Sequence, residues 1–197
     1  RKYVQLEKKL NNEEIKLFKL KKSNVLQEQF LAIRKILALE NSDYIITYYL
    51  DRKPILNSEF NISISHSHEI AALVLSNNRK IGLDVQLKES KILNIQNKFL
   101  NKFEKLNIED DPSIDILTML WTSKESIYKA IGLKGISFSK NIKIDKVIEK
   151  DKTGKGYYII VTAKSSRKIN ESEYDEYWEK RNSIISLMIP GFEMHNT

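Results

Sequence analysis

The stretch Asp110–Gly132, DDPSIDILTMLWTSKESIYKAIG, predicts a long helix. It opens with two acidic residues and a proline, which is typical of a helix N-terminus because the first helical N–H groups have no partner within the helix. Apolar residues then recur at helical spacing up to Tyr128. Gly132 ends the pattern, and glycine is common just after a helix because it readily adopts the left-handed conformation.

Helices and strands are predicted on both sides of this helix. Before it, the apolar patterns predict, in order, a helix over Asn12–Leu20, a helix capped by Ser23 or Asn24 that continues to Leu37, strands over Tyr44–Leu50 and Phe60–Ser65, a hairpin of Ala71–Ser76 with Lys80–Val85, and a helix over Ile92–Phe103. After it, they predict strands over Phe138–Val147, Gly156–Ala163 and Ser183–Ile189, with a turn at Thr153-Gly154 and a short helix over Tyr174–Lys180. The predicted fold class is therefore α+β.

Two halves are predicted along the chain. No Pro-, Gly- or Ser-rich linker separates them, yet each contains helices and strands, and the order of elements permits two similar α+β halves that meet face to face. We divide the chain into an N-terminal α+β half, residues 1–89, and a C-terminal α+β half, residues 90–197, which carries the long helix.

The composition excludes several classes of protein. The chain has 197 residues, and 41% of them are hydrophobic, which is enough for a buried core and excludes a disordered chain. It contains no cysteine, which excludes disulfides, thiolate metal sites and a cysteine nucleophile. No apolar run is long enough to span a bilayer, and no signal-peptide pattern is visible. We therefore expect a soluble cytoplasmic protein that does not bind a membrane.

The chain is basic. It has 33 Lys and Arg against 26 Asp and Glu, a formal net charge of +7. Such a balance suits an acidic partner, which includes nucleic acid, an anionic cofactor, an acidic protein or a lipid surface, but it is also compatible with a solvated lysine-rich surface. Lysine greatly outnumbers arginine, whereas proteins that read nucleic acids favour arginine for its bidentate contacts. Nucleic acid is therefore not the partner we expect.

The first segment with chemical potential is Asn61–His68, NISISHSH. A serine hydrolase would need a Gly-x-Ser-x-Gly turn, which is absent here. His66 and His68 are spaced to share a strand face and to bind zinc as a pair, but no third ligand is evident and the remaining histidine is His195. Hydroxyl and imidazole groups together fit a site that donates hydrogen bonds to phosphate.

Two further segments each contribute a carboxylate. Asp84 in Ile81–Gln86, IGLDVQ, stands at the end of a predicted strand after a glycine. Glu125 and Lys129 lie on one face of the long helix, since they are four residues apart. On its own, Asp84 is also compatible with a solvated aspartate at a strand end. Glu125 and Lys129 are likewise compatible with an ordinary surface ion pair. Trp121 and Tyr128 lie close to Glu125 on the helix, which argues against a freely solvated carboxylate.

A divalent cation would connect the three segments. Mg²⁺ prefers oxygen ligands and is usually bound by one or two carboxylates together with substrate phosphates and water. Asp84 and Glu125 would supply the carboxylates, while Ser65, His66 and Lys129 would hold the phosphates. The residues therefore indicate a Mg²⁺-dependent phosphoryl-type transfer, and Mn²⁺ would suit the same oxygen ligands.

The three motifs together resemble the 4′-phosphopantetheinyl transferase superfamily. They are Asn61–His66 (NISISH), Ile81–Asp84 (IGLD) and Trp121–Lys129 (WTSKESIYK), and their order and spacing resemble the long single-chain type that activates surfactin synthetase and other peptide and polyketide synthetases. Weaker similarities occur upstream, at Phe30–Arg34 and Arg52–Pro54. The resemblance implies transfer of phosphopantetheine from coenzyme A to a serine of an acyl or peptidyl carrier protein, with release of adenosine 3′,5′-bisphosphate. It also implies two α+β halves related by a pseudo-twofold axis, with the active site at their interface.

The resemblance assigns catalytic roles to three residues. Asp84 and Glu125 would ligate Mg²⁺, and Lys129 would contact the phosphates of coenzyme A. Glu125 would also help to deprotonate the carrier serine, directly or through a water. The partners expected on this interpretation are coenzyme A and an acidic carrier protein. A monomer is expected because the interface between the halves lies within one chain.

The remaining roles concern coenzyme A and the third metal ligand. By resemblance, Ser65 and His66 would face the nucleotide phosphates, with Lys53 nearby. Many relatives have Asp-x-Glu where this chain has Asp84-Val-Gln86, so Gln86 would be a weak, neutral metal ligand. This departure leaves room for a non-catalytic relative that binds coenzyme A or a carrier protein without transfer. A basic nucleic-acid-binding protein is a third hypothesis, supported by the net charge alone.

Overall fold

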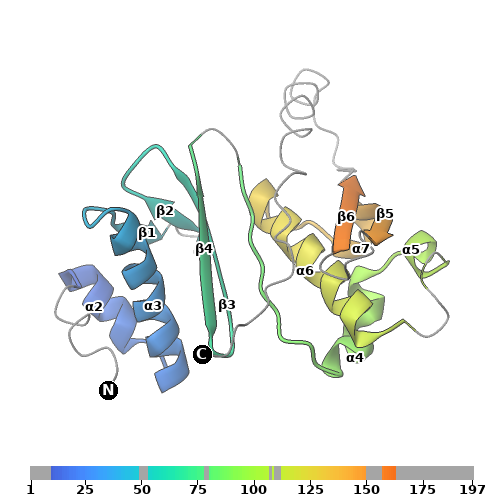
Figure 1. Ribbon diagram of the computed structural model, residues 1–197, viewed down its shortest axis with the longest axis horizontal. Coiled ribbons are helices and arrows are strands. Elements are labelled where there is room, and N and C mark those ends of the chain that lie inside the picture. Colours follow the sequence, from blue (N-terminus) through green and yellow to red (C-terminus); the bar gives the residue numbers. More distant parts are fainter. Residues whose placement is uncertain are drawn as a thin grey trace. The chain divides into compact units, whose positions relative to one another are not determined.

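The computed structural model describes residues 10–48, 53–77, 80–106, 108, 112–149 and 157–162, and side chains are described outside 145–149 and 157–162. The chain divides into two compact units, Arg1–Leu87 and Lys88–Thr197. The described residues form helices and two-stranded antiparallel sheets (Figure 1), so the predicted α+β class is confirmed. Among them, no helix is both long and apolar enough to cross a membrane.

The first unit begins with two helices that start at side-chain caps. α2 (Asn12–Lys19) starts with a capping box, in which Asn11 Oδ1 accepts the Glu14 N–H at 2.9 Å and the Glu14 carboxylate accepts the Asn11 N–H. α3 (Asn24–Glu40) starts at Ser23, whose hydroxyl accepts the Leu26 N–H at 3.3 Å. Both helices begin close to where the sequence predicts them.

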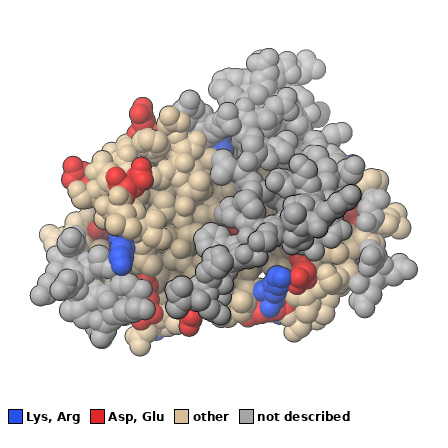
Figure 2. All heavy atoms as spheres, viewed as in Figure 1, with Lys and Arg blue, Asp and Glu red and all other residues tan. Residues whose placement is uncertain are grey.

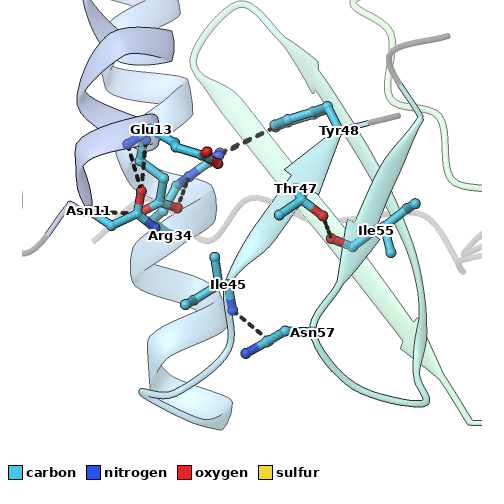
Figure 3. A network of polar contacts seen from close by, with 9 residues as sticks. Asn11, Glu13, Arg34, Ile45, Thr47, Tyr48, Ile55 and Asn57 are labelled. Atoms are coloured by element: carbon cyan, nitrogen blue, oxygen red, sulfur yellow. Dashed lines mark hydrogen bonds and ion pairs between the residues drawn. The ribbon is translucent and has the colours of Figure 1, made fainter. Parts of the chain in front are cut away.

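Arg34 of α3 ties the two helices to the first strand (Figure 3). Its guanidinium donates to Glu14 at 3.2 Å and to the Tyr48 hydroxyl at 3.5 Å, and it lies 3.4 Å from the centre of the Phe30 ring. The side chains of Arg34 and Glu14 are only 11% and 10% exposed. This ion pair therefore lies largely outside solvent, where pairing matters more than it does at a surface.

Two antiparallel strand pairs complete this unit. β1 (Ile46–Tyr48) pairs with β2 (Pro54–Leu56), and β3 (Asn61–Ser67) pairs with β4 (Ile70–Ser76). Thr47 Oγ1 donates to the Ile55 carbonyl, and Asn57 Oδ1 accepts the Ile45 N–H (Figure 3). Helices α2 and α3 lie on one side of the β3–β4 hairpin (Figure 1). The buried core between α3 and the strands consists of Ile33, Leu37, Ile46, Leu56 and Ile62.

The predicted hairpin of Ala71–Ser76 with Lys80–Val85 is wrong. The strand β4 pairs instead with β3, through a turn at His68, where φ is 50°. The carbonyl of His68 accepts a hydrogen bond from Gln29 of α3 at 2.5 Å, which holds the turn against the helix. Residues 80–87 form no strand, because their alternate backbone N–H groups are taken up by serine side chains of β3.

The second unit is built around the long helix. Its elements are α4 (Lys91–Phe99), α5 (Lys102–Leu106), α6 (Ile114–Ile131), α7 (Phe138–Asn141), β5 (Lys143–Glu149) and β6 (Tyr157–Thr162), and β5 pairs with β6. The buried core consists of Ile92, Phe99, Leu100, Leu117, Leu120, Ile142 and Ile144. Gly132 ends α6 in the left-handed conformation, as predicted, with φ 66°.

Three element boundaries in this unit differ from the prediction. The helix expected over Ile92–Phe103 is two helices, because Asn101 caps α5 and ends the run after Phe99. The long helix starts at Ile114 with Ser113 as its cap. The acidic pair before Pro112, where the start was predicted, lies outside the described residues. The strand expected from Phe138 begins at Lys143, after α7. The elements predicted over 174–180 and 183–189 and the turn at 153–154 also lie outside the described residues.

Candidate active site

A ladder of serine hydroxyls joins β3 to the segment that carries Asp84. Ser63, Ser65 and Ser67 accept the backbone N–H groups of Leu83, Val85 and Leu87 at 3.0, 3.1 and 3.1 Å, respectively. In each hydrogen-bonded pair the two residues are twenty positions apart, so residues 83–87 run parallel to β3 in constant register. These serines project from one face of β3, since successive strand side chains alternate between faces. Figure 1 shows the segment after β4 on the side of the hairpin away from α3.

Both oxygens of the Asp84 carboxylate have partners within the first unit. Ser65 Oγ donates to Asp84 Oδ1 at 3.0 Å, and Gln86 Nε2 donates to Asp84 Oδ2 at 3.2 Å. Ser65 is 6% exposed, whereas Gln86 is exposed. Asp84 is therefore oriented by the buried hydroxyl of Ser65 and, on the solvent side, by the amide of Gln86.

The predicted phosphate-binding residues of this unit lie in different places. Ser65 projects from the same face of β3 as Ser63 and Ser67, whereas the neighbouring His66 projects from the opposite face, with Ile62 and Ile64. His66 is exposed, and Lys53 is exposed just before β2. A phosphate near His66 would thus approach β3 from the side away from the serine ladder.

In the second unit, the centre of the α6 motif is a buried lysine. The side chain of Lys124 is 0% exposed, and its Nζ lies 2.7 Å from Glu104 Oε2. Three backbone carbonyl oxygens, those of Phe99, Ile142 and Phe138, also lie within hydrogen-bond distance of Nζ, at 2.7, 2.9 and 3.1 Å, so the three ammonium hydrogens are shared among four acceptors. Burial lowers the pKa of Lys124 because the charged form loses water, while the hydrogen bond and charge of Glu104 oppose that shift.

Glu104 is as fully satisfied as its partner. Its Oε2 also accepts the Asn101 N–H at 2.9 Å, and its Oε1 accepts the Ile144 N–H at 2.7 Å. The pair therefore links α4, α5, α6, α7 and the start of β5 through one ammonium and one carboxylate. A buried ion pair contributes little net stability against an apolar alternative, but removing one partner is costly. Its evident effect is to fix how α6 is rotated against its neighbours.

That rotation decides where the proposed catalytic side chains point. At 3.6 residues per turn, Glu125 lies about 100° around the helix from Lys124, and Lys129 about 140°. Both side chains are half-buried. Trp121 and Tyr128 point toward the core, where their rings pack against Phe99 and Phe138 at centroid distances of 5.3 to 5.5 Å. The lysine and the aromatic rings thus hold one face of α6, and Glu125 and Lys129 occupy the adjacent face.

The oxygen groups of the predicted metal ligands, taken residue by residue, are of the kind that magnesium prefers. Asp84 and Glu125 offer carboxylate oxygens, and Gln86 can offer an amide carbonyl only if its side chain turns its N–H away from Asp84. The described residues contain no group of three or more His, Cys, Asp or Glu that could hold a metal ion. This is compatible with Mg²⁺, which commonly takes one or two carboxylates and fills its remaining positions with phosphate oxygens and water.

Charge is distributed without a dominant patch on the face shown in Figure 2. There, the described Lys and Arg side chains lie at separate places among Asp and Glu side chains. Two surface pairs in the second unit, Lys88 with Asp115 at 2.7 Å and Lys91 with Glu89, show the same mixing. On this face, the described Lys and Arg side chains do not gather into one basic stripe.

Comparison with known proteins identifies the family. A protein-family model described as the 4′-phosphopantetheinyl transferase superfamily (ACPS) matches residues 80–183, more than half of the chain. The chain therefore belongs to the 4′-phosphopantetheinyl transferase superfamily. The matched region contains Asp84, Gln86, Glu125 and Lys129, whereas Lys53, Ser65 and His66 precede it. A comparison with curated proteins found no match.

Sequence reasoning missed the buried pair and the serine ladder, although both left a signal. Lys124 follows Leu117 and Leu120 at helical spacing, so it occupies a position in the apolar stripe of α6 where a charged residue is unusual. Ser63 and Ser65 alternate with Ile62 and Ile64, and Ser67 continues the alternation between two histidines. That pattern predicts a strand with one polar face, but it does not reveal that the polar face is covered.

Proposed function

We propose that this protein transfers the 4′-phosphopantetheine group of coenzyme A to a serine of an acyl or peptidyl carrier protein, in a Mg²⁺-dependent reaction that releases adenosine 3′,5′-bisphosphate. The observation that carries the proposal is the family match over residues 80–183, which spans both carboxylates and Lys129. We further propose the long single-chain type, in which two α+β halves are related by a pseudo-twofold axis and act as a monomer. The halves correspond to residues 1–89 and 90–197.

The reaction is a phosphoryl-type transfer with a simple balance. The carrier serine oxygen forms a bond to the phosphorus that bears pantetheine, and the bond from that phosphorus to the bridging pyrophosphate oxygen breaks. Adenosine 3′,5′-bisphosphate leaves with the bonding electrons. The serine proton passes to Glu125, directly or through a water, because a carboxylate placed beside a hydroxyl serves as a general base.

The other residues of the proposed site bind and orient the two substrates. Lys129 neutralises the pyrophosphate of coenzyme A, and His66 and Lys53 contact its remaining phosphates. Asp84 and Glu125 hold the metal ion. Mg²⁺, when bound, withdraws charge from the pyrophosphate oxygens and so favours departure of the leaving group. Both carboxylates must reach one cation for this mechanism to operate.

The direct test is transfer to carrier proteins. Purified protein is incubated with coenzyme A, Mg²⁺ and apo carrier proteins of the fatty-acid, polyketide and peptide-synthetase types. The mass of each carrier protein is then measured by mass spectrometry. We expect the addition of one phosphopantetheine to at least one carrier. Glu125→Gln should lower kcat by orders of magnitude. Asp115→Asn, on the same helix but in an exposed ion pair with Lys88, is the matched control and should keep its activity. Unmodified carriers across the whole panel would contradict the proposal.

A second candidate is a relative that binds coenzyme A or a carrier protein without transfer. It is favoured by one observation, the hydrogen bond that Gln86 Nε2 donates to Asp84, since an amide in this position satisfies the carboxylate without a cation. Calorimetry distinguishes the two candidates. A binder would take up coenzyme A with little dependence on Mg²⁺, would modify no carrier, and would be almost unaffected by Glu125→Gln.

The positive net charge makes a further prediction about the carrier. If the partner is an acidic carrier protein, a basic surface speeds encounter and orients the complex, and salt screens both effects. Raising the salt concentration should therefore increase the KM for the carrier protein more than the KM for coenzyme A. Equal changes in the two constants would assign the charge to composition alone.

A further inference from the structure

We propose that Ser65 is a positioning residue for Asp84 and that its hydroxyl does not bind a phosphate of coenzyme A. This inference rests on the proposed function, because it assigns to Ser65 the task of fixing a carboxylate that holds the metal ion. It is carried by the serine ladder of β3, in which one rung differs from the others.

The hydrogen-bonding capacity of its hydroxyl limits what Ser65 can bind. A hydroxyl has one hydrogen to donate. The hydrogen of Ser65 is directed at Asp84 Oδ1, 3.0 Å away, while its oxygen accepts the Val85 N–H at 3.1 Å. The group cannot donate to a phosphate without releasing Asp84. Ser65 is 6% exposed and Asp84 is half-buried, so a phosphate would have to displace the carboxylate from a hydroxyl that has little access to water, which makes the exchange costly.

The two bonds of Ser65 act on neighbouring atoms of the same segment. One fixes the backbone at Val85 and the other fixes the side chain of the preceding residue, Asp84, so together they restrict both the position and the rotation of the carboxylate. Gln86 contributes only from the exposed side. Groups that orient a metal-binding carboxylate typically change metal affinity 10- to 100-fold when they are removed.

Ser63 supplies a matched control. It is 5% exposed, lies on the same face of β3, and accepts the Leu83 N–H at 3.0 Å, so it reproduces the structural part of the Ser65 rung. Asp84 is bonded to the Ser65 hydroxyl, which lies one rung further along β3. Ser63→Ala and Ser65→Ala each remove one acceptor of a backbone N–H, and only Ser65→Ala also removes the donor to the carboxylate.

The first measurement follows the metal ion. Free Mn²⁺ is titrated by electron paramagnetic resonance in the presence of coenzyme A, and kcat is measured against Mg²⁺ concentration. We expect Ser65→Ala to weaken Mn²⁺ binding about tenfold, to raise the Mg²⁺ concentration that gives half-maximal kcat, and to leave the KM for the carrier protein unchanged. Ser63→Ala should match wild type in all three quantities. Equal Mn²⁺ affinities for the two variants would overturn the proposal.

The second measurement needs no substrate and separates this inference from the proposed function. The free energy of unfolding in urea is measured for Ser65→Ala, Asp84→Ala and the double variant, and the same cycle is measured with Ser63→Ala. We expect a coupling between Ser65 and Asp84 that is clearly larger than that between Ser63 and Asp84. If the two couplings are equal, Ser65 does not hold Asp84, whether or not the protein is a transferase. If wild type modifies no carrier while the coupling is present, the proposed function fails and the contact stands.

Discussion

Replacing Lys124 with methionine should destabilise the protein more than any surface substitution. Methionine matches the length of the lysine chain but provides no donor, so Lys124→Met leaves three carbonyl oxygens and one glutamate oxygen without the ammonium that now bonds them. Glu104 keeps its two backbone N–H donors, from Asn101 and Ile144, and this limits the loss. The perturbation therefore tests how much the protein depends on its buried cation.

The magnitude follows from the burial of the pair. Removing one partner of a buried ion pair costs about 3–5 kcal/mol, because the remaining charge is left uncompensated out of water. Since Glu104 retains two donors, we expect a value near the lower limit, about 3 kcal/mol. For a chain of this length, about 3 kcal/mol corresponds to a fall in Tm of roughly 6–12 °C. Such a loss is a large fraction of the stability of a typical domain.

The assay is urea unfolding followed by far-UV circular dichroism, with Lys88→Met as the matched control. Lys88 also forms an ion pair with a carboxylate at 2.7 Å, but its side chain is 66% exposed and that of Asp115 is 53% exposed. Solvent screens such a pair, so Lys88→Met should cost less than about 1 kcal/mol. The two ion pairs, both within the second unit, have the same length, but only that of Lys124 is buried and joined to backbone carbonyls.

A chemical rescue can separate the ammonium group from general effects of the substitution. The chain contains no cysteine, so Lys124→Cys creates a single thiol that can be alkylated in urea with bromoethylamine, giving a side chain nearly identical to lysine. After refolding, this protein should regain most of the lost stability, whereas the same variant alkylated with an ethyl group should not. If Lys124→Met costs no more than Lys88→Met, or if the ethyl and aminoethyl derivatives are equally stable, the buried ammonium group does not stabilise the fold.

Three further predictions use the same structure. Burial lowers the pKa of Lys124 in the folded state, so the unfolded chain binds more protons at alkaline pH just below about 10.4. In that range the stability of wild type relative to Lys124→Met should therefore rise with pH. Urea unfolding at several pH values tests this, and a fall in relative stability would contradict it. Gln86→Glu adds a charged oxygen beside Asp84 and should tighten Mn²⁺ binding in the absence of coenzyme A, roughly tenfold, as measured by paramagnetic resonance; an unchanged affinity would place residue 86 outside the metal site. Arg34→Met removes the guanidinium that links α3 to Glu14, so it should lower the free energy of unfolding by about 2 kcal/mol and speed amide hydrogen exchange in α2. Unchanged exchange in α2 would show that other contacts hold that helix.

Much of the local structure could be predicted from the sequence. The apolar spacing identified α2, α3 and α6, and Gly132 marked the end of α6 correctly. These features depend on hydrogen bonds between residues three or four positions apart and on caps adjacent to them, so the information lies within a short stretch of chain. The motif around Glu125 was recognisable for the same reason, since its residue types occur at a fixed spacing on one helix.

Strand pairing and the broken helix required the tertiary structure. The segment 80–87 has the composition of a strand, yet three of its alternate N–H groups bond to serine hydroxyls twenty residues earlier, and β4 pairs with β3. The run from Ile92 has helical periodicity throughout, but Asn101 and Glu104 form a cap that starts a new helix. In both cases a side chain competes with the backbone for a hydrogen bond, and the spacing of apolar residues does not indicate which of the two groups forms it.

The chemical groups can be recognised from the sequence alone: two carboxylates, a helix that carries Glu125 and Lys129, and a chain without thiols. How those groups are held depends on contacts in the folded protein. Lys124 meets a glutamate twenty residues away, and Ser65 meets an aspartate nineteen residues away. The pattern of apolar residues shows which face of an element is buried, but the partner that a buried polar group finds there depends on segments distant in sequence, because the hydrogen bond is satisfied in space and not along the chain.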